Sequence, residues 1–240
     1  MMEKILIVLP TYNEENILQK NVLKVRKFCQ DNLRNFDWQI LIADNGSTDK
    51  TPKLAQELSQ EYPRIDYFHT SQKGRGAALK IAWNKNNYLA DIYLYMDIDL
   101  ATDLNHLPQL IRSIIQEGYD LTIGSRLQKE SKTERSFLRE FISRFYNLLL
   151  KIFFGLKIKD YQCGFKAVNQ KIVEKIVPLI KNNNWFFDTE LIILSHKNNY
   201  KIKEIPVKWI EKRDKKRKSK VKIIKTAWED IKGIIRLKLS

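Results

Sequence analysis

The stretch "DIYLYMDIDLATD", residues Asp91 to Asp103, decides the fold. Its apolar run from Ile92 to Met96 predicts a buried strand, because it is short and rich in β-type residues. Two aspartates, Asp97 and Asp99, follow this strand with one residue between them. Carboxylates that close together repel each other, and they are costly to desolvate at the end of a core strand. A positive group is therefore expected beside them.

Similar apolar runs alternate with helical patterns through the first half of the chain. The predicted strands are Ile5–Leu9, Gln39–Ala43, Ile65–His69, Ile92–Met96 and Leu121–Ile123. The predicted helices between them are Asn16–Gln30, Thr51–Glu61, Gly76–Asn86 and Leu107–Glu117. This βαβ alternation predicts an α/β fold with a mostly parallel central sheet that is covered on both faces. Ligands of such sheets bind beyond the carboxyl ends of the strands.

The second half of the chain is predicted to hold further strands at Phe165–Val168 and Ile202–Trp209, and helices at Gln170–Ile180 and Asp188–Asn198. Two helical stretches, residues 136–156 and 221–240, are amphipathic and carry basic residues beside wide apolar faces. Such helices suit a lipid surface. For residues 136–156, packing as an ordinary core helix stays an equal alternative, since amphipathic helices usually pack inward. Trp185 and Trp228 are the candidates for interfacial anchors.

The amino-acid composition limits the class of binding partner and the cellular compartment of the protein. The 240 residues could form one large domain or one domain plus an appendage, and the 43% that are hydrophobic are enough for a sizeable core. The formal net charge of +15 points to an anionic partner. Nucleic acid, phospholipid and a phosphorylated substrate all fit this charge.

Cys29 and Cys163 have no metal-ligand spacing, which indicates free thiols in a reducing compartment. The N-terminal apolar run predicts a strand rather than a signal sequence, and no stretch reaches the roughly 18 apolar residues of a membrane span, so we expect any membrane contact to be peripheral.

Polar clusters follow three of the predicted strands. Asp44 of "DNGSTD" comes directly after a strand; a capped turn explains the residues that follow it but leaves this carboxylate free for a nucleobase or ribose. In "PTYNE", Tyr12 could stack on a base and Glu14 could accept its N–H groups, or the segment could simply end a strand and cap a helix. The three histidines lack the spacing of a ligand set and are expected to be surface or packing residues.

The aspartate pair predicts a site for a divalent cation and a diphosphate. In extended backbone, residues i and i+2 point the same way, so Asp97 and Asp99 would face one cleft. Mg²⁺ takes one or two protein carboxylates and keeps phosphate oxygens and water as its other ligands. An Asp-x-Asp in a solvated loop is the alternative, because the pattern is common by chance.

Taken in order, "LPTYNE", "ADNGSTDKT", "KGRGAA", "MDIDLATD" and "GSR" resemble the inverting, metal-dependent glycosyltransferases of family 2, which have the GT-A fold. Farther along, "KDYQCGFKA", "NNWFFDTELI" and "EIPVKW" are similar to the dolichyl-phosphate (polyprenyl-phosphate) β-glucosyltransferase and mannosyltransferase branch. The resemblance covers Ile5 to Lys220. It implies a GT-A catalytic domain over residues 1–220, followed by a basic amphipathic helix over residues 221–240 that contacts the membrane surface.

The resemblance also implies roles for individual residues. The nucleotide-sugar would be held by Pro10, Tyr12, Glu14, Asp44, Gly76 and Asp97, and Mg²⁺ or Mn²⁺ by Asp97 and Asp99. The acceptor phosphate would be held by Arg126, Arg139, Ser143, Gln162 and Lys220. The catalytic residues would be Asp99, Arg126 and Asp160. Asp188 and Glu190 of "FFDTE" are expected to orient the acceptor, to support Asp160 or only to begin a helix.

The implied activity is inverting transfer of a hexose, with UDP-glucose as the best candidate donor, to dolichyl or polyprenyl phosphate on the cytoplasmic face of a membrane. A GDP-mannose or UDP-N-acetylglucosamine donor and a sugar-hydroxyl acceptor stay as alternatives. Nucleic acid is not expected as a partner, because it leaves the carboxylates unexplained. A phosphate acceptor has a second pKa near ~6, so no dedicated general base is expected.

This chain departs from the family pattern at two places. Leu100 and Ala101 stand where many relatives carry Gln or Ser, so no side-chain contact from Ala101 is expected. Arg217 or Lys218 replaces the glycine usually found before the C-terminal "SK", which leaves the register of the basic residues on the phosphate open.

Overall fold

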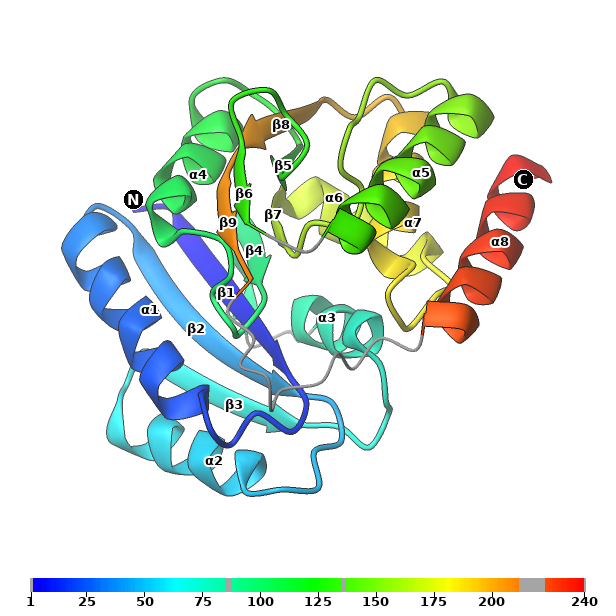
Figure 1. Cartoon of the computed structure of the whole chain (residues 1–240). Helices are drawn as coiled ribbons and strands as arrows, with labels where there is room; N and C mark the ends of the chain where they lie inside the picture. The colour runs from blue at the N-terminus through cyan, green and yellow to red at the C-terminus, as the bar shows by residue number, and fades with distance from the viewer. Residues whose placement is uncertain (1, 85–87, 135–136, 212–222, 240) are drawn as a thin grey trace.

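A seven-stranded sheet forms the centre of the computed structural model, which describes residues 2–84, 88–134, 137–211 and 223–239 (Figure 1). The strand order is β3-β2-β1-β4-β7-β5-β8, and only β7 runs antiparallel to its neighbours β4 and β5. The bounds of these strands are Lys4–Thr11 (β1), Asp37–Asp44 (β2), Ile65–His69 (β3), Ile92–Met96 (β4), Leu121–Ser125 (β5), Phe165–Asn169 (β7) and Ile202–Pro206 (β8). The predicted α/β fold with a mostly parallel sheet is confirmed.

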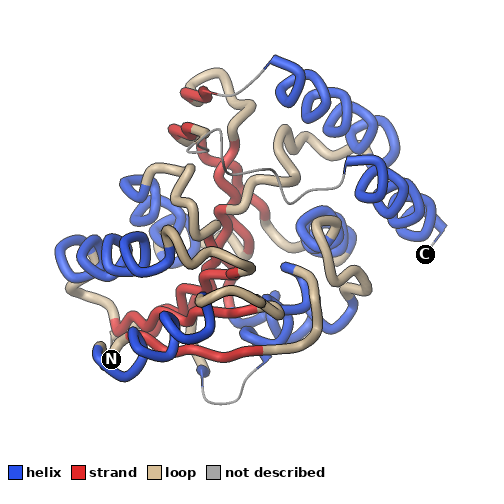
Figure 2. The backbone as a smooth tube through the Cα atoms, turned by 60° about the horizontal axis from the view of Figure 1, so that its bottom comes forward, coloured by secondary structure: helices blue, strands red, loops and turns tan. Residues whose placement is uncertain are grey.

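Helices cover both faces of this sheet (Figure 2). One face packs against α1 (Leu18–Asn32), α2 (Thr51–Glu61) and α4 (Leu107–Ile115), and the other against α3 (Arg75–Asn84), α6 (Gln170–Lys175) and α7 (Phe187–Lys197). Successive residues of β1 show the two faces, because Ile5 and Ile7 belong to the first core cluster while Leu6 and Val8 belong to the second. A strand that is buried on both faces has a continuous run of apolar residues, and the sequence of β1 shows such a run.

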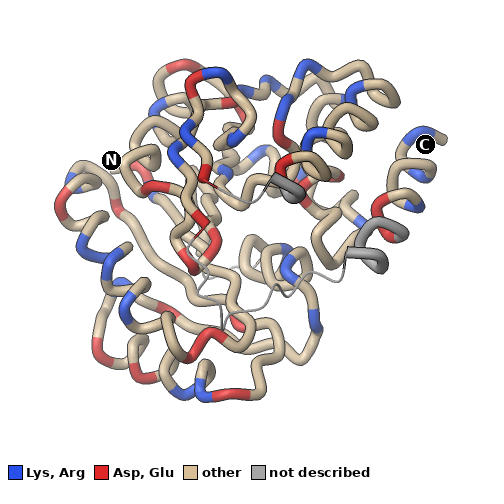
Figure 3. The backbone as a smooth tube through the Cα atoms, viewed as in Figure 1, with Lys and Arg blue, Asp and Glu red and all other residues tan. Residues whose placement is uncertain are grey.

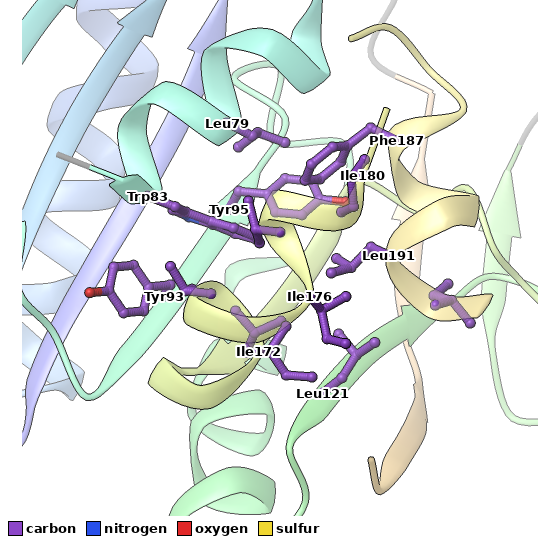
Figure 4. Packing of buried hydrophobic residues seen from close by; sticks show 14 of the residues in the cluster. Leu79, Trp83, Tyr93, Tyr95, Leu121, Ile172, Ile176, Ile180, Phe187 and Leu191 are labelled. Atoms are coloured by element: carbon purple, nitrogen blue, oxygen red, sulfur yellow. The ribbon is translucent and has the colours of Figure 1, made fainter. Parts of the chain in front are cut away.

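Aromatic side chains pack together on the second face of the sheet, around β4 (Figure 4). The Trp83 ring of α3 lies 5.9 Å from the Tyr95 ring of β4 and 6.1 Å from the Phe187 ring of α7, measured between centroids. Tilted and edge-on pairs of this kind add to the stabilisation that burial provides. The cluster therefore fixes the strand that leads into Asp97.

Two predicted elements differ from the structure. The strand predicted over Ile202–Trp209 is divided, because the chain leaves β8 at Pro206 and a separate strand, β9 (Lys208–Ile210), pairs with β6 (Lys132–Glu134). The β6 strand has no apolar run and was not predicted. The helix predicted over Gln170–Ile180 ends at Lys175 and is followed by a 3-10 turn, Val177–Leu179, since Pro178 cannot continue the backbone hydrogen bonding. A second 3-10 turn, Leu104–His106, precedes α4.

The helices α5 (Phe137–Phe154) and α8 (Ile223–Leu239) pack against each other and against α7 at the edge of the molecule (Figure 1). The Lys238 ammonium of α8 donates to the carbonyl of Phe153 (2.9 Å), and Lys197 of α7 donates to the carbonyl of Leu237 (2.6 Å). Both helices also expose apolar side chains: Phe141, Ile142, Phe145, Leu148, Ile152, Phe153, Ile231, Ile235 and Leu239. Each helix therefore has an inner packed side and an outer apolar side. Among the described residues, no helix is both long and apolar enough to cross a membrane.

Candidate functional site

The order of the strands places the candidate site at the carboxyl ends of β1 and β4. Sequential strands run outward from β1 to β2 and β3 on one side, while β4 lies on its other side. At such a switch point the loops that follow neighbouring strands turn in opposite directions and leave a crevice, where open α/β sheets bind their ligands. The loops that follow β1 and β4 carry "YNE" and "DIDLATD".

The loops after β1 and β2 hold each other through hydrogen bonds. Asn13 has a positive φ of 52°, its backbone N–H donates to Ser47 Oγ (2.8 Å), and its Oδ1 accepts from the backbone N–H of Thr48 (2.7 Å). The backbone N–H of Glu14 donates to Thr51 Oγ1 (2.7 Å). Asn tolerates the left-handed conformation better than most residues, which explains its place at this bend. The structure thus gives Asn13 a role that the sequence did not indicate.

Of the residues predicted to hold the nucleotide, Tyr12 is partly exposed, while Pro10 and Glu14 are buried. Pro10 lies inside β1, which extends one residue beyond it. Gly76 is buried in the first turn of α3, where a Cβ atom would crowd Phe187 and the segment before α7. Packing therefore explains this glycine.

Asp44 is fully buried and its carboxylate is occupied by protein partners. Its Oδ1 accepts from the backbone N–H (3.1 Å) and the hydroxyl (2.5 Å) of Ser47, and its Oδ2 lies 2.8 Å from Nδ1 of His69. The side chain of His69 is 45% exposed, so it reaches the surface where Asp44 does not. The prediction of His69 as a mere surface or packing residue missed this pair, although Asp44 and His69 are direct partners in the register of β2 and β3.

The two aspartates of the opening motif lie in a tight turn. Strand β4 ends at Met96, the backbone N–H of Asp97 donates to the carbonyl of Gly164 (3.1 Å), and that of Leu100 donates back to the carbonyl of Asp97 (3.1 Å). The expectation of extended backbone through Asp99 was therefore wrong. Leu100 is buried with a positive φ of 50°, a strained conformation for leucine.

Arg75 is the positive group beside this turn. Its Nη1 lies 3.0 Å from Oδ1 of Asp97, its Nη2 pairs with Asp188, and its guanidinium stacks on the Trp185 ring at 4.6 Å from the centroid. Only 7% of the Arg75 side chain is exposed, against 41% for Asp97. Trp185, predicted as an interfacial anchor, thus lies under a site residue. The sequence motif "KGRGAA" drew attention to the glycines on either side of Arg75, but it did not reveal the contact between the Arg75 side chain and Asp97.

Asp188 connects Arg75 to a second buried cation. Lys166 Nζ lies 2.8 Å from Oδ1 of Asp188, and the Tyr95 hydroxyl donates to the same carboxylate. Burial disfavours the charge on Lys166 and lowers the pKa of its ammonium to about 7, and the nearby Arg75 acts in the same direction. Asp188 lies in the first turn of α7, as the helix-start alternative predicted, and it also supports Arg75, which was not predicted.

Arg126 and Asp160 form a buried two-pronged ion pair. Arg126 Nε lies 2.7 Å from Oδ2 and Nη2 lies 2.8 Å from Oδ1 of Asp160, and the backbone N–H of Arg126 donates to the same carboxylate (3.0 Å). Burial raises the pKa of Asp160, but the charge and hydrogen bonds of Arg126 outweigh it and hold this pKa below its ordinary value. The guanidinium lies 5.7 Å from the ring centroid of Trp209 on β9, another neighbour that the sequence did not reveal.

Of the remaining residues predicted for the acceptor phosphate, Gln162 lies in the "DYQ" loop and Ser143 on a helix tied to that loop. The backbone N–H of Gln162 donates to Asp160 (3.2 Å). Ser143 of α5 is 9% exposed, and its carbonyl accepts from the side chain of Asn147 (2.7 Å), whose Oδ1 accepts from the backbone N–H of Tyr161 (3.0 Å). Asn147, not predicted, thus ties α5 to this loop. Lys220 and the side chain of Arg139 lie outside the described residues.

The turn that holds Asp97 and Asp99 fits a hard divalent cation. Two carboxylates stand two residues apart, and Asp97 rests so closely on Gly164 that a Cβ atom there would overlap its carboxylate. Within the part of the chain that the structure describes, no group of three or more His, Cys, Asp or Glu residues could hold a metal. Two carboxylates completed by phosphate oxygens and water suit Mg²⁺ or Mn²⁺, whereas Zn²⁺ sites use more nitrogen or sulfur ligands.

Solved structures share this architecture at low sequence identity. A glucosyl-3-phosphoglycerate synthase from Mycobacterium tuberculosis, solved with UDP, matches 98% of this chain and 80% of its own with a TM-score of 0.70 and 18% identity. A mannosyltransferase from Pyrobaculum calidifontis, solved with GDP-Man and Mn²⁺, matches 90% of this chain and 59% of its own with a TM-score of 0.57 and 14% identity. The fold is therefore the α/β fold of GT-A glycosyltransferases, as predicted.

Sequence comparison gives nearer relatives. Glycosyltransferase AglD of Haloferax volcanii is 33% identical over 88% of this chain, and a dolichyl-phosphate beta-glucosyltransferase of Trichomonas vaginalis is 32% identical over 85%. The chain spans 34% and 65% of the length of these two proteins, which is less than two thirds of each. The family model of glycosyl transferase family 2 matches residues 6–177. With these motifs at the ends of β1, β2 and β4, the chain belongs to glycosyl transferase family 2.

Proposed function

We propose that this chain transfers a hexose from a nucleotide-sugar to the phosphate of dolichyl or another polyprenyl phosphate, with inversion at the sugar. One observation carries the proposal: the carboxylate of Asp160, predicted at the reacting centre, is fully buried and bound by both prongs of Arg126. A carboxylate held in this way, with a lowered pKa, is a poor proton acceptor. A sugar acceptor that is already ionised needs no proton-accepting residue in the protein.

A phosphate monoester meets this requirement, because its second pKa near ~6 leaves it largely dianionic at neutral pH. Arg126 keeps N–H groups beyond the pair with Asp160, and guanidinium matches the geometry of phosphate oxygens. Asp160 would then act through Arg126, fixing its orientation. Gln162 lies on the same loop, and Ser143 lies on the helix tied to it.

The apolar outer sides of α5 and α8 support a lipid-linked acceptor. Phe145 is 56% exposed and Ile152 70% exposed on α5, and exposed apolar side chains on a helix that also bears lysine and arginine suit a membrane surface. Among the described residues, Figure 3 shows Lys and Arg spread over many elements with acidic residues between them, which is unlike the basic stripe of a nucleic-acid-binding surface. We therefore place the chain peripherally on the cytoplasmic face of a membrane. Cys29 and Cys163, both free and buried, agree with a reducing compartment.

The donor would lie in the crevice between the ends of β1 and β4, with Asp97 and Asp99 holding Mg²⁺ or Mn²⁺. When bound, the cation would neutralise charge on the departing nucleoside diphosphate. Tyr12 and Glu14 would contact the base, and Asp44 would keep the "DNGS" loop in place through Ser47. UDP-glucose is the first candidate donor, because a relative is named as a dolichyl-phosphate beta-glucosyltransferase. GDP-mannose, UDP-N-acetylglucosamine and a sugar-hydroxyl acceptor are the alternatives.

Radiolabelled UDP-glucose, GDP-mannose and UDP-N-acetylglucosamine, supplied separately with polyprenyl phosphate and Mn²⁺, test the proposal. Label from UDP-glucose should enter the organic phase as an acid-labile lipid product. The matched control is Arg126→Met, which should abolish this transfer. Label from GDP-mannose alone would move the donor assignment to mannose, and label from none of the three would contradict the proposed function.

A further inference from the structure

The C-terminal helix α8 is joined to the segment that precedes α7. Glu190 pairs with Arg236 of α8, and its Oε2 accepts from the backbone N–H of Asn182 (2.7 Å). A second link joins the side-chain N–H of Asn184 to Oε2 of Glu229 on α8 (3.2 Å). Glu190 is 1% exposed, and a buried carboxylate without a cation is strongly unfavourable. Arg236 therefore determines where Glu190, and with it Asn182, can lie.

The helix also lies flush against this region. Gly233 of α8 faces the ring of Phe186, and a Cβ atom at this position would overlap the ring. Phe186 is 1% exposed and directly precedes α7. Apolar packing and the two polar links thus converge on the same short segment, residues 182–186.

That segment supports the first turn of α3, which carries Arg75. The carbonyl of Asn183 accepts from the backbone N–H of Ala77 (2.9 Å), in the first turn of α3. The Trp185 ring lies under the guanidinium of Arg75, which reaches Asp97 at 3.0 Å. A continuous series of contacts therefore runs from α8 through residues 182–185 to the aspartate turn.

We propose that Arg236 is a positioning residue for the donor site: through Glu190 it holds residues 182–185, and these hold Arg75 beside Asp97. This inference rests on the proposed function in that Asp97 is taken to bind the donor. It goes further by making α8, whose Ile231 and Ile235 point outward with 47% and 53% exposure, a support of the nucleotide site. The helix that is proposed to touch lipid would thus be physically connected to the donor crevice.

Hydrogen exchange of the full chain tests the physical link without any ligand. Arg236→Ala should speed exchange of the Ala77 amide and of residues 182–186 by about tenfold, because these amides are predicted to open together. Lys238→Ala is the matched control: it removes another cation of α8, but its partner is the carbonyl of Phe153 on α5. If faster exchange in Arg236→Ala were confined to residues 229–239, the proposal would be wrong. Asn184→Ala, which removes only the second link, provides the same test if Arg236→Ala does not fold.

Nucleotide binding without acceptor tests the consequence for the site. Calorimetry with UDP and Mn²⁺ should show affinity at least about fivefold weaker for Arg236→Ala, partial recovery for Arg236→Lys, and no change for Lys238→Ala, because coupling through packed networks has this size. The acceptor KM should stay unchanged, whereas a general loss of stability would lower the folded fraction and leave the UDP affinity of the folded chain unchanged. Equal affinity in Arg236→Ala and the unsubstituted chain would overturn the inference. If the unsubstituted chain bound neither UDP nor GDP, the proposed function would fail, and the exchange experiment would still decide whether α8 holds residues 182–186.

Discussion

Nη1 of Arg75 lies 3.0 Å from Oδ1 of Asp97, and this ion pair joins the first residue of α3 to the residue that follows β4. The contact answers the question that the aspartate pair raises, because a cation from another part of the chain stands beside the carboxylates. Arg75 is itself held by Asp188 and by the face of Trp185. The charge of the aspartate turn is therefore balanced partly by the protein, in a geometry that a bound cation and diphosphate can complete.

Replacing Arg75 with methionine should damage both stability and transfer. The substitution leaves Asp188 with Lys166 as its single cation and removes the countercharge of Asp97, so the free energy of unfolding should fall by about 3 kcal/mol. Denaturant unfolding measures this loss, and the transfer rate at saturating donor should fall at least roughly tenfold. Lys73→Met, which removes an exposed cation from the loop just before α3, is the control and should change stability by less than about 0.5 kcal/mol. Unchanged turnover in Arg75→Met would show that this pair has no part in the site.

Asp160→Asn tests whether this carboxylate orients Arg126 or accepts a proton. The variant should keep one prong of the pair and lose the charge, so turnover should fall by about the same factor at every pH from roughly 6.5 to 9. A pH–rate profile of kcat measures this directly. Recovery of the lost rate at high pH would instead assign Asp160 as a general base. Asp103→Asn, at a cap before α4, serves as the control substitution and should leave the profile unchanged.

The fold and the position of the aspartate turn could be predicted from the sequence, for a physical reason. The predicted bounds match the structure for three elements: strands Ile65–His69 and Ile92–Met96 and helix Thr51–Glu61. Strands that are buried on both faces and amphipathic helices both have local patterns of apolar residues, which the sequence shows directly. The position of the aspartate turn followed from the same rule, since polar clusters after parallel strands meet at one edge of the sheet.

The contacts that organise the site could not be predicted, because they join residues far apart in the chain. Arg75 with Asp188, Asp44 with His69 and Glu190 with Arg236 have no local pattern to reveal them. The β6 strand was missed because its three polar residues pair only with β9, formed some 75 residues later in the chain. The turn at Leu100 was missed because a positive φ at leucine contradicts its ordinary preference.

Asp230 of α8 should make stability depend on pH. Burial, with a smaller effect of Glu229, raises the pKa of its carboxyl to about 7, so the folded chain binds this proton more tightly than the unfolded chain, whose aspartates titrate near ~3.9. Its contribution is fully present below that lower value and is lost as pH rises from about 4 through 7. Asp230→Asn should therefore be more stable than the unsubstituted chain at pH 8, by about 1–4 kcal/mol, and similar at pH 4. Urea unfolding at the two pH values measures the difference.

The exposed Glu174→Gln is the control for this experiment, and its stability should follow that of the unsubstituted chain at both pH values. An Asp230→Asn variant that is equally destabilised at pH 4 and pH 8 would show that the carboxyl is ionised and paired in the folded chain.

The outer side of α5 should be required for binding to lipid. Phe145→Asp combined with Ile152→Asp should weaken flotation with vesicles of anionic phospholipid by at least about a hundredfold, because burying each apolar side chain is worth roughly 1.5–3 kcal/mol. Leu89→Asp is the matched control, since Leu89 is also a strongly exposed apolar residue (67%) but lies on neither α5 nor α8. Equal flotation of the double variant and the control would place the lipid contact elsewhere.

The proposed acceptor nucleophile is a phosphate that is already ionised when it reaches Arg126. The most direct measurement compares polyprenyl phosphate with the polyprenol of the same chain length, using labelled UDP-glucose and Mn²⁺ under identical detergent conditions. We expect lipid-linked label with the phosphate and none above background with the alcohol. Transfer to the alcohol at a comparable rate would contradict it, because that reaction needs a base that the Asp160–Arg126 pair does not supply.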